Sequence, residues 1–549
     1  MTDVLIANIE YGGYISLVKM AVFVVSFFAW LPVVSWVHKD AKDVKTRVPL
    51  WTSIVFTAGA VATIVWLIVP LFTIALLFFI VAVSTASLAY VMHRNAMVAS
   101  FERVLTADHI KGLFIDEQKK VAAVSKGMTF RTANNNEVPM PQHKSADFYG
   151  YKTANEILDD AIWRRTSHIS FLPTVNTYNV VYRIDGVGFK QPDRDKEEID
   201  LFIRFLKQLA DLDINERRKP QKGKFQIAKG QDKYEWEVTT AGSTAGEQVQ
   251  LVHIREEGLL KLADIGLTAN QYEMLNQIRD RKSGVFIIAG PGKTGVTTTF
   301  YAILRNHDPF LFNINTLEKH PTAELQNLTQ NVFSLSDTGT TSYARKLQTI
   351  LRTGPDIVGV ADCQDAETAQ LICVGAKDGK IMYTTLEMPN IINALGKWIS
   401  LVNDRKLVAA TLIGISCQRL IRKLCDQCKQ AYEPNMQVLR KFNIPADKVK
   451  VFYRAGKVIY DKRGKESICQ HCQGTGFYGR TAVFECIIIN DELRTAIKGN
   501  KPLPEISTLF RRAKMLYMQE QAIRKVAEGI VSINEVIREF APPRKKANE

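Results

Sequence analysis

The residues best suited to chemistry lie in one stretch, Gly284–Leu304, which reads GVFIIAGPGKTGVTTTFYAIL. The apolar run 285–289 predicts a buried parallel strand, a glycine-rich turn follows it, and 297–304 has a helical pattern. In such a unit, N–H groups of the turn and of the helix N-terminus bind phosphate. The nucleotide-binding residues that we expect here are Gly290, Gly292, Lys293, Thr294, Gly295, Val296, Thr297 and Thr298.

This loop departs from the usual phosphate-loop pattern where a cation is needed. In G-x-x-x-x-G-K-[ST], the lysine contacts the β- and γ-phosphates and the hydroxyl side chain binds Mg²⁺. Gly290 and Gly295 fill the glycine places and Thr297 the hydroxyl place, but Val296 stands at the lysine place. Lys293 lies three residues earlier. It could reach inward and replace the missing cation, or it could be a solvated lysine at the loop apex.

A second candidate site is formed by two C-x-x-C pairs. The residues are Cys425, Cys428, Cys469 and Cys472. Two such pairs can close a tetrahedron around Zn²⁺ with no open position, which is the arrangement of a structural zinc site. Free buried thiols are the alternative, and they fit a cytosolic, glycine-rich segment less well. His471, between the second pair, is expected to be a bystander.

The first 92 residues differ from the rest because they contain two long apolar runs, 20–37 and 50–92. About 20 apolar residues span a bilayer as a helix. We expect transmembrane helices near residues 18–37, 50–69 and 71–92, with a turn at Pro70. A re-entrant hairpin over 50–92 is the alternative, and it leaves the remainder of the chain on the same side of the membrane.

Charge indicates the orientation of this anchor. The loop 38–47 is rich in lysine and arginine, whereas the first ten residues carry only Asp3 and Glu10. The positive-inside rule then places the N-terminus outside and everything after Met92 in the cytoplasm. The formal net charge of +15 fits attraction to the anionic inner leaflet. No zinc-finger, RRM-like or basic-helix pattern points to nucleic acid, so we expect no nucleic-acid partner.

Strands alternate with helices after the anchor, which predicts an α/β protein whose core is a largely parallel sheet covered by helices on both faces. The expected segments are a membrane anchor (1–92), a juxtamembrane helix and polar linker (93–150), a small α/β domain (151–256), a nucleotide-binding core (257–420), a tetracysteine element (421–480) and a C-terminal helical region (481–549).

Several motifs between residues 155 and 540 resemble, in order and spacing, those of the type II secretion and type IV pilus assembly ATPases, the GspE/PulE family of hexameric P-loop NTPases. They are RTSHISFLPTVNTYNVVYRIDGVGF, LADLDINERRKPQKGKF, LRTGPDIVGVADCQDAETAQ, SCQRLIRKLCDQC, CQHCQGTGFYGRTAVFE and QEQAIRKVAEGIVSINEVIREF. The resemblance implies a small α/β domain of the N2 type, a RecA-like P-loop core, ATP with Mg²⁺, and Zn²⁺ at the four cysteines. It also implies a homo- or hetero-oligomeric ring, a hexamer in this family, that works with an inner-membrane platform protein at the bacterial inner membrane.

The resemblance also assigns roles to single residues. Asp362 falls on the family's Walker B acid and Glu318 on its other catalytic acid. Arg183, Arg217 and Arg218 fall on arginines that face the nucleotide of the neighbouring subunit in this family.

Departures from the family pattern fall on the chemistry rather than on the scaffold. They are Val296, Lys319, Gln364, Lys380 and Glu387, of which Lys380 and Glu387 replace the family's two histidines. Hydrolysis of ATP needs a cation at the γ-phosphate, Mg²⁺ and a positioned water. We therefore expect impaired or absent hydrolysis, a pseudo-ATPase. The alternative is an active motor that powers pilus or pseudopilus assembly, with a site rebuilt around Lys293 and Lys380.

Overall fold

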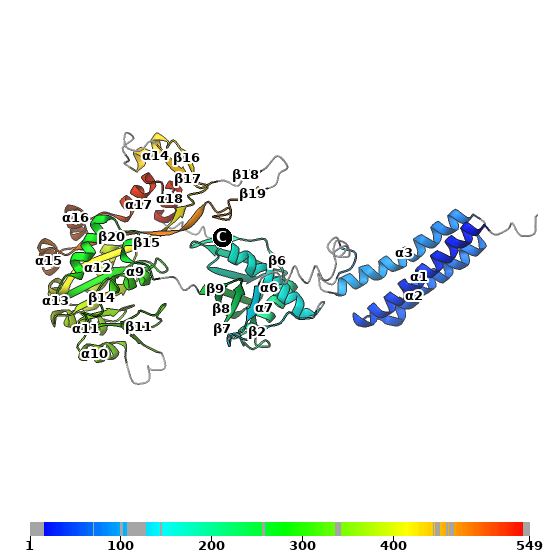
Figure 1. The fold of residues 1–549 in the computed structure, drawn as a ribbon, viewed down its shortest axis with the longest axis horizontal. Coiled ribbons are helices and arrows are strands. Elements are labelled where there is room, and N and C mark those ends of the chain that lie inside the picture. Colours follow the sequence, from blue (N-terminus) through cyan, green and yellow to red (C-terminus); the bar gives the residue numbers. More distant parts are fainter. Residues whose placement is uncertain are drawn as a thin grey trace, which may run out of the picture. The chain divides into compact units, whose positions relative to one another are not determined.

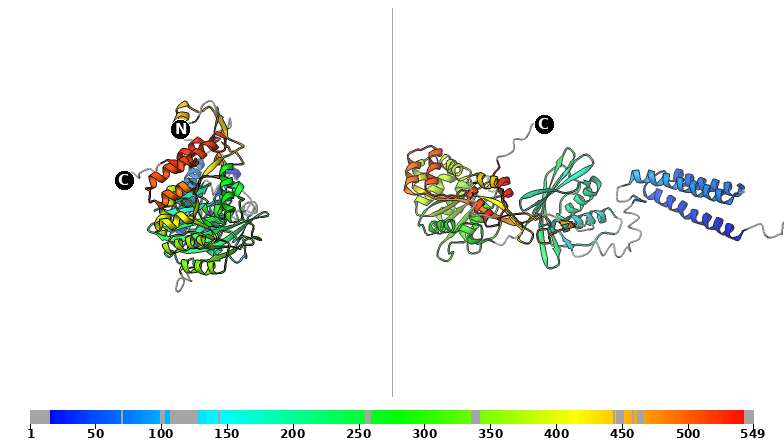
Figure 2. Two further views of the ribbon diagram at one scale, coloured as in Figure 1. Left: turned by 90° about the vertical axis from the view of Figure 1, so that its left-hand side faces the viewer. Right: turned by 90° about the horizontal axis from the view of Figure 1, so that it is seen from above.

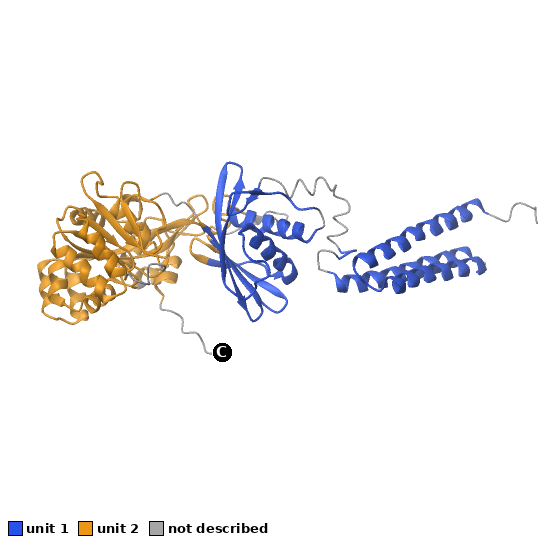
Figure 3. Ribbon diagram, turned by 90° about the horizontal axis from the view of Figure 1, so that it is seen from below, with its two compact units in different colours: residues 1–162, 168–182, 188–253 blue, residues 163–167, 183–187, 254–549 orange. Residues whose placement is uncertain are grey.

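The computed structural model describes most of the chain, and the described part divides into two compact units (Figure 3). The described residues are 16–69, 71–98, 103–106, 128–142, 145–254, 259–334, 342–442, 444, 451–456, 459–460 and 466–541. Unit 1 comprises residues 1–162, 168–182 and 188–253, and unit 2 comprises residues 163–167, 183–187 and 254–549. The predicted turn at Pro70, residues 542–549 of the predicted C-terminal region, and residues 99–102 and 107–127 of the predicted juxtamembrane segment lie outside the described residues.

Three long apolar helices open the chain: α1 (Leu17–Asp43), α2 (Val48–Ile68) and α3 (Phe72–Met97). They pack side by side (Figures 1 and 2) around a small aromatic core that contains Trp30, Trp66 and Phe79. All three are long and apolar enough to cross a membrane. The predicted number of spans therefore agrees with the structure, and the anchor is compatible with association with the inner membrane.

An ionic network holds the C-terminal ends of α1 and α3 together. One carboxylate oxygen of Asp40 accepts hydrogen bonds from the hydroxyl of Tyr90 at 2.6 Å and from Nε of Arg94 at 2.7 Å. Both charged side chains are largely shielded from solvent. Asp40 and Arg94 lie in the last turns of their helices, so the C-terminal ends of α1 and α3 are on the same side of the three-helix group. This agrees with the orientation predicted from the basic loop 38–47, which puts both ends on one side of the membrane.

Unit 1 also contains an α/β fold with a nine-stranded sheet in the order β2-β1-β7-β8-β9-β3-β4-β5, with β6 paired to β4. The strands are β1 (Met128–Arg131), β2 (Glu137–Val138), β3 (His168–Pro173), β4 (Thr177–Ile184), β5 (Val187–Lys190), β6 (Arg194–Asp195), β7 (Gln221–Lys229), β8 (Asp232–Ser243) and β9 (Gly246–Ile254). Its helices are α6 (Ala146–Trp163) and α7 (Lys196–Leu209). Ile199, Phe202 and Leu206 give α7 an apolar stripe at helical spacing, and Asp195 caps its N-terminus.

The α/β fold begins at β1, within the segment up to residue 150 that was predicted to include a polar linker. Met128 and Phe130 are buried on one face of β1, which pairs with β7 so that Phe130 lies opposite Ile227. The ring of Phe130 also contacts Tyr151 and Phe205. The linker prediction was wrong there because a four-residue strand among polar residues gives no periodic signal of its own.

Unit 2 is built on a seven-stranded sheet in the order β12-β11-β13-β14-β10-β15-β20. Its strands are β10 (Gly284–Ala289), β11 (Ile314–Glu318), β12 (Thr329–Val332), β13 (Ile357–Val360), β14 (Ile381–Leu386), β15 (Leu412–Leu424) and β20 (Phe477–Ile488). All neighbouring pairs are parallel except β15 and β20. The largely parallel sheet predicted from the alternation of strands and helices is therefore confirmed.

Helices cover both faces of this sheet. They are α8 (Ala269–Arg279), α9 (Val296–Leu304), α10 (Tyr343–Arg352), α11 (Ala366–Lys377), α12 (Ile391–Val402) and α13 (Arg405–Thr411), with the one-turn η2 (Leu262–Asp264). Every residue of β10 is buried. Val285 and Ile287 face the apolar cluster that includes α10–α13, whereas Phe286 and Ile288 face the cluster of α8 and α9.

The C-terminal part of unit 2 consists of the segments that lie between the long strands β15 and β20 or follow β20 in sequence. Four helices follow β20: α15 (Asp491–Lys498), α16 (Leu503–Arg512), α17 (Met518–Ala527) and α18 (Ile533–Phe540). Between the two strands lie α14 (Met436–Lys441), β16 (Gln430–Tyr432) paired with β17 (Phe452–Arg454), and β18 (Ile459–Tyr460) paired with β19 (Glu466–Ser467). Because β15 and β20 cross the limits predicted for the cysteine segment, that segment is an insertion between two core strands.

A buried carboxylate fixes α18 to β15. Glu535 is 1 % exposed and receives two hydrogen bonds from the guanidinium of Arg422, at 2.9 and 2.7 Å. Arg538 adds two more, at 3.0 and 2.7 Å. Burial alone would raise the pKa of Glu535, but these bonds lower it to about 2.

We predict that Glu535→Gln lowers the free energy of unfolding of unit 2 by about 3 kcal/mol at pH 7, because it leaves the charge of Arg422 buried without its partner. The measurement is urea unfolding of the full-length protein. In wild type this contribution is complete above pH 4.5 and is lost as the pH falls towards 2. The exposed Glu528→Gln is the matched control and should change the unfolding midpoint little.

A buried histidine gives a second pH dependence. His307 is 3 % exposed, and its Nε2 lies 2.7 Å from the hydroxyl of Tyr383. Burial lowers its pKa to about 4; nearby Arg279 adds to this effect and Asp280 opposes it. Since the unfolded chain binds this proton near pH 6.5, folding stability should fall by about 2 kcal/mol from pH 7.5 to pH 5. His307→Gln should remove that part of the loss in urea unfolding, and an unchanged pH profile would contradict the prediction.

Candidate functional site

The predicted phosphate loop lies at the carboxyl edge of the central sheet, between β10 and α9. Gly295 is the N-cap of α9 with φ of +83°, a conformation that suits glycine. The hydroxyl of Thr294 donates to the carbonyl of Pro291 at 2.6 Å, and Nε2 of Gln418 donates to the carbonyl of Thr294 at 2.9 Å. One hydrogen bond within the loop and one from β15 therefore fix the conformation of the loop.

Close approach within the loop explains Gly290. A Cβ at this position would lie 2.5 Å from Oγ1 of Thr294 and 2.8 Å from Cγ2 of Val296. No side chain fits there without moving the turn. The strand, loop and helix predicted from the sequence are confirmed.

The residue at the lysine place is apolar and brings no positive charge to the loop. Val296 is the first residue of α9 and packs against the apolar cluster of α8 and α9. Lys293 lies at the loop apex, is exposed and has φ of +66°. Thr297 is exposed in the first turn of α9, and Thr298 beside it is half-buried. The loop thus has N–H donors and a hydroxyl, and its one lysine is on the outer side.

A carboxylate lies against the loop where the family has a histidine. A Cβ built on Gly292 would be only 2.8 Å from Oε1 of Glu387, the residue that follows β14. Glu387 is exposed. A negative charge therefore stands beside the loop backbone that would bind phosphate.

The other histidine replacement, Lys380, lies far from this edge. It precedes β14, whose residues Ile381 and Leu386 pair with the first and last residues of β10. Its Nζ donates to the carbonyl of Pro355 at 3.0 Å. Since six strand residues rise about 20 Å, this ammonium belongs to the opposite edge, which argues against a site rebuilt around Lys380.

The two predicted acids occupy different environments. Asp362 follows β13 at the same edge as the loop, is exposed, has φ of +51°, and its N–H donates to Oγ1 of Thr385 at 2.7 Å. Glu318, at the end of β11, is 2 % exposed. Its carboxylate accepts hydrogen bonds from Tyr301 at 2.6 Å, Thr316 at 2.7 Å and Gln330 at 3.2 Å. Asp362 has the accessible carboxylate, whereas Glu318 fixes α9 to the sheet.

The structure places the three predicted arginines on the surface. Arg183 is an exposed residue of β4, and Arg217 and Arg218 are exposed in the turn before β7. Their contact with a neighbouring subunit's nucleotide stays a prediction. Gln364, where the family has an arginine, is also exposed.

Two residues that shape this edge of the sheet were not predicted from the sequence. Gln418 is 1 % exposed and holds the loop through Thr294, as described above. The hydroxyl of Tyr343 lies 2.8 and 2.6 Å from the carbonyls of Leu317 and Ala361, so it joins the ends of β11 and β13. A buried glutamine within the apolar pattern of β15 was the one available signal.

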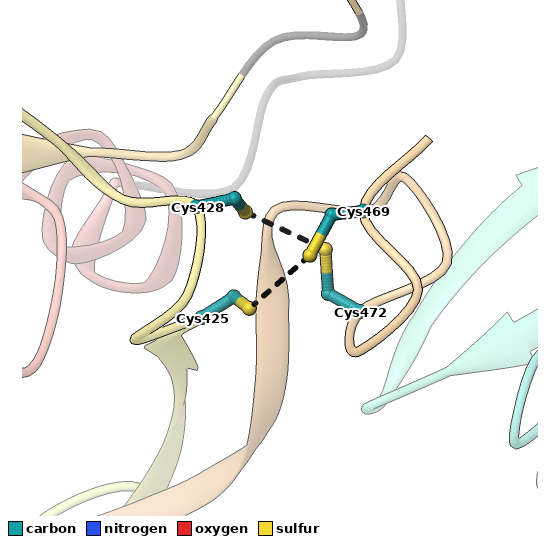
Figure 4. A group of neighbouring side chains, drawn as sticks. All are labelled: Cys425, Cys428, Cys469 and Cys472. Carbon is teal, nitrogen blue, oxygen red and sulfur yellow. Dashed lines mark hydrogen bonds between the residues drawn. The ribbon is translucent and has the colours of Figure 1, made fainter. Parts of the chain in front are cut away.

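The four predicted cysteines come together (Figure 4). Cys425 and Cys428 follow β15, and Cys469 and Cys472 precede β20. Their sulfur atoms all lie within 4.8 Å of one another, with 3.9 Å between Cys425 and Cys469 and 3.6 Å between Cys428 and Cys472. Sulfur ligands of a tetrahedral Zn²⁺, at about 2.3 Å from the metal, have similar spacings.

The electrostatics of the cluster also suit a cation. Burial, hydrogen bonds with the thiols of Cys472 and Cys425 and, to a smaller extent, repulsion by these neighbours raise the pKa of Cys428, so a thiolate here needs a cation beside it. Backbone N–H groups supply further donors, for example from Gly476 to the sulfur of Cys472 at 3.3 Å. The residues present therefore fit a structural zinc ion.

Comparisons with known proteins agree with this architecture. The chain is 27 % identical over 402 residues to the type IV pilus assembly ATPase PilB of Thermus thermophilus, covering 73 % of this chain and 44 % of that protein. It is 30 % identical over 385 residues to the putative type II secretion system protein E of Escherichia coli, covering 70 % of this chain and 75 % of that protein.

Among solved structures, the X-ray structure of the Legionella pneumophila ATPase DotB is similar in fold, with a TM-score of 0.50 and 15 % identity, covering 73 % of this chain and 98 % of that chain. The family model described as type II/IV secretion system protein matches residues 146–538, which include most of the α/β fold of unit 1, the phosphate loop and the cysteine cluster. The chain therefore belongs to the type II/IV secretion system protein family.

Proposed function

We propose that this protein is a membrane-anchored, ring-forming subunit of a type II secretion or type IV pilus assembly machine in which ATP hydrolysis is impaired or lost. The observation that carries the proposal is the charge at the phosphate loop. Val296 packs into the apolar cluster at the lysine place, and the Glu387 carboxylate stands beside Gly292.

Both changes act in the same direction. A lysine at the γ-phosphate makes a charge-assisted contact that strengthens as negative charge develops in the transition state. Loss of such a contact costs on the order of several kcal/mol. A carboxylate in place of a neutral or protonated histidine adds repulsion between like charges. The triphosphate would therefore meet a loop with a net loss of positive charge.

Some of the machinery for a nucleotide is retained. The N–H groups of the loop and of the first turn of α9 could hold phosphate, and Thr297 and Asp362 are the residues that would hold Mg²⁺, which supplies charge neutralisation when bound. Retention of these groups fits a subunit that binds nucleotide weakly or uses the fold as a scaffold.

Assembly and location follow from the family and the anchor. Relatives named as secretion and pilus assembly ATPases support a ring, which we propose to be a hexamer of this chain alone or mixed with an active relative. The helices α1–α3 support a multi-pass position in the bacterial inner membrane, with the large domains in the cytoplasm and an inner-membrane platform protein as partner. Arg183, Arg217 and Arg218 are proposed to face the neighbouring subunit.

The alternative is an active motor in which Lys293 replaces the usual lysine. One observation favours it: Lys293 lies in the loop itself, and its exposed side chain is free to change direction. The two functions differ in whether Lys293 is required for turnover.

We predict that the full-length protein in detergent binds a fluorescent ATP analogue weakly and releases little phosphate. The double variant Val296→Lys, Glu387→His should bind ATP roughly tenfold more tightly or better, because it restores the cation and removes the carboxylate. Val296→Leu, which keeps an apolar side chain, is the matched control. Turnover in the parent protein that disappears in Lys293→Ala would contradict the proposal and establish the active motor.

We also propose that the four cysteines bind one Zn²⁺ per chain. Metal analysis of the purified protein should find one equivalent, and Cys472→Ser should lower it to near zero because a tetrahedral site loses a thiolate. Cys373→Ser, at a buried cysteine on α11 outside the cluster, should leave the metal content unchanged. Equal metal content in the two variants would contradict the assignment.

A further inference from the structure

Three stacked side chains join the cysteine cluster to the segment Trp163–Ser167, which belongs to the same compact unit. The imidazole of His471 is stacked on the ring of Tyr478, with centroids 3.9 Å apart and planes 23° apart. The guanidinium carbon of Arg165 lies 4.1 Å from the centroid of the same ring. Since two groups so close to one ring cannot share a face, Tyr478 lies between the imidazole and the guanidinium.

His471 contacts the cluster directly. It lies between Cys469 and Cys472 in sequence, and its Nδ1 is 3.4 Å from the sulfur of Cys425. A metal-bound thiolate accepts hydrogen bonds, so the proton belongs on Nδ1 when the metal is present. This hydrogen bond orients the imidazole ring, and the orientation of the ring determines how it stacks on Tyr478.

Arg165 makes further contacts to the same turn of the cysteine segment and to Asp185. Its Nε donates to Oε1 of Gln473 at 3.2 Å, and its Nη2 donates to the carbonyl of Phe477 at 3.3 Å. Nη2 also lies 3.6 Å from the carboxylate of Asp185. Arg165 therefore links the turn 473–478 to the segment Arg183–Val187, which is likewise part of unit 2.

Three residues of this linkage have positive backbone φ angles. Arg165, Asp185 and Gln473 have φ of +59°, +48° and +50°, in the left-handed region that is disfavoured for residues with a Cβ. Such conformations persist where surrounding contacts hold them. The N–H of Ser167 donates to the carbonyl of Arg183 at 2.9 Å, which joins the two segments to each other.

We propose that the metal at the four cysteines controls the order of segments 163–167 and 183–187, with His471, Tyr478 and Arg165 as the connecting residues. This rests on the zinc proposal above and not on the state of the nucleotide site. Metal bound through Cys469 and Cys472 fixes the turn that carries three partners of Arg165. Without the metal, the turn 473–478 is no longer fixed through Cys469 and Cys472. The contacts of Arg165 with this turn then weaken, and the two segments become less ordered.

Hydrogen exchange of the full-length protein in detergent tests the proposal. Zinc-loaded protein and protein stripped with a chelator are compared, and metal content is measured on the same samples. We expect amides of 163–167 and 183–187, that of Ser167 above all, to exchange about tenfold faster after zinc removal, while those of β10 stay protected. Unchanged exchange in these segments after complete loss of zinc would overturn the proposal, as would a protein that binds no zinc.

Two variants of Tyr478 distinguish loss of the ring stacking from a general destabilisation of the fold. Tyr478 is 39 % exposed, so Tyr478→Leu should fold, and Tyr478→Phe keeps the ring as the matched control. Zinc-loaded Tyr478→Leu should show fast exchange at Ser167 with its full zinc content, and chelation should add little. Tyr478→Phe should behave as wild type. Wild-type exchange in Tyr478→Leu, or loss of zinc from it, would overturn the proposed order of connection.

Discussion

Burial of β10 on both faces is the constraint on which the rest of unit 2 depends. Its residues alternate between two apolar clusters, so neither its position nor its register can change without exposing a core. Because β13, β14 and β10 are parallel, their carboxyl ends meet at one edge. That topology alone brings the phosphate loop, Asp362 and Glu387 together.

At this edge, geometry and charge are independent of one another. The loop conformation is fixed by Gln418, Thr294 and the close approach at Gly290, none of which needs a phosphate. The cation and its histidine partner could therefore be lost without loss of the fold. The proposed loss of hydrolysis is therefore compatible with an intact nucleotide-binding fold.

Long apolar runs and fixed spacings were predictable from the sequence, and contacts between distant residues were not. The three apolar helices, β10 and α9 have strong local patterns. The burial of Phe130 depends on pairing with β7, about a hundred residues later, so the short strand β1 was missed. A motif match assigned Glu318 to a catalytic acid of the family, but the direction of its side chain depends on Tyr301 and Gln330. Only the strand direction shows that Lys380 and Glu387 lie at opposite edges.

One strand, β15, carries three fixed points of unit 2: Gln418 at the phosphate loop, Arg422 at the buried Glu535, and Leu424 next to Cys425 of the cluster. Cys425 lies seven positions after Gln418, about 23 Å along an extended chain. The pairing of β15 with β20 is regular up to Arg422 and shifts between Arg422 and Leu424. The Arg422–Glu535 contact therefore lies on β15 between the cysteines and the phosphate loop, and it resists a displacement of the strand that starts at the cysteines. This arrangement fits the proposal that a metal at the cysteines would act on the segments held by Arg165 rather than on the phosphate loop.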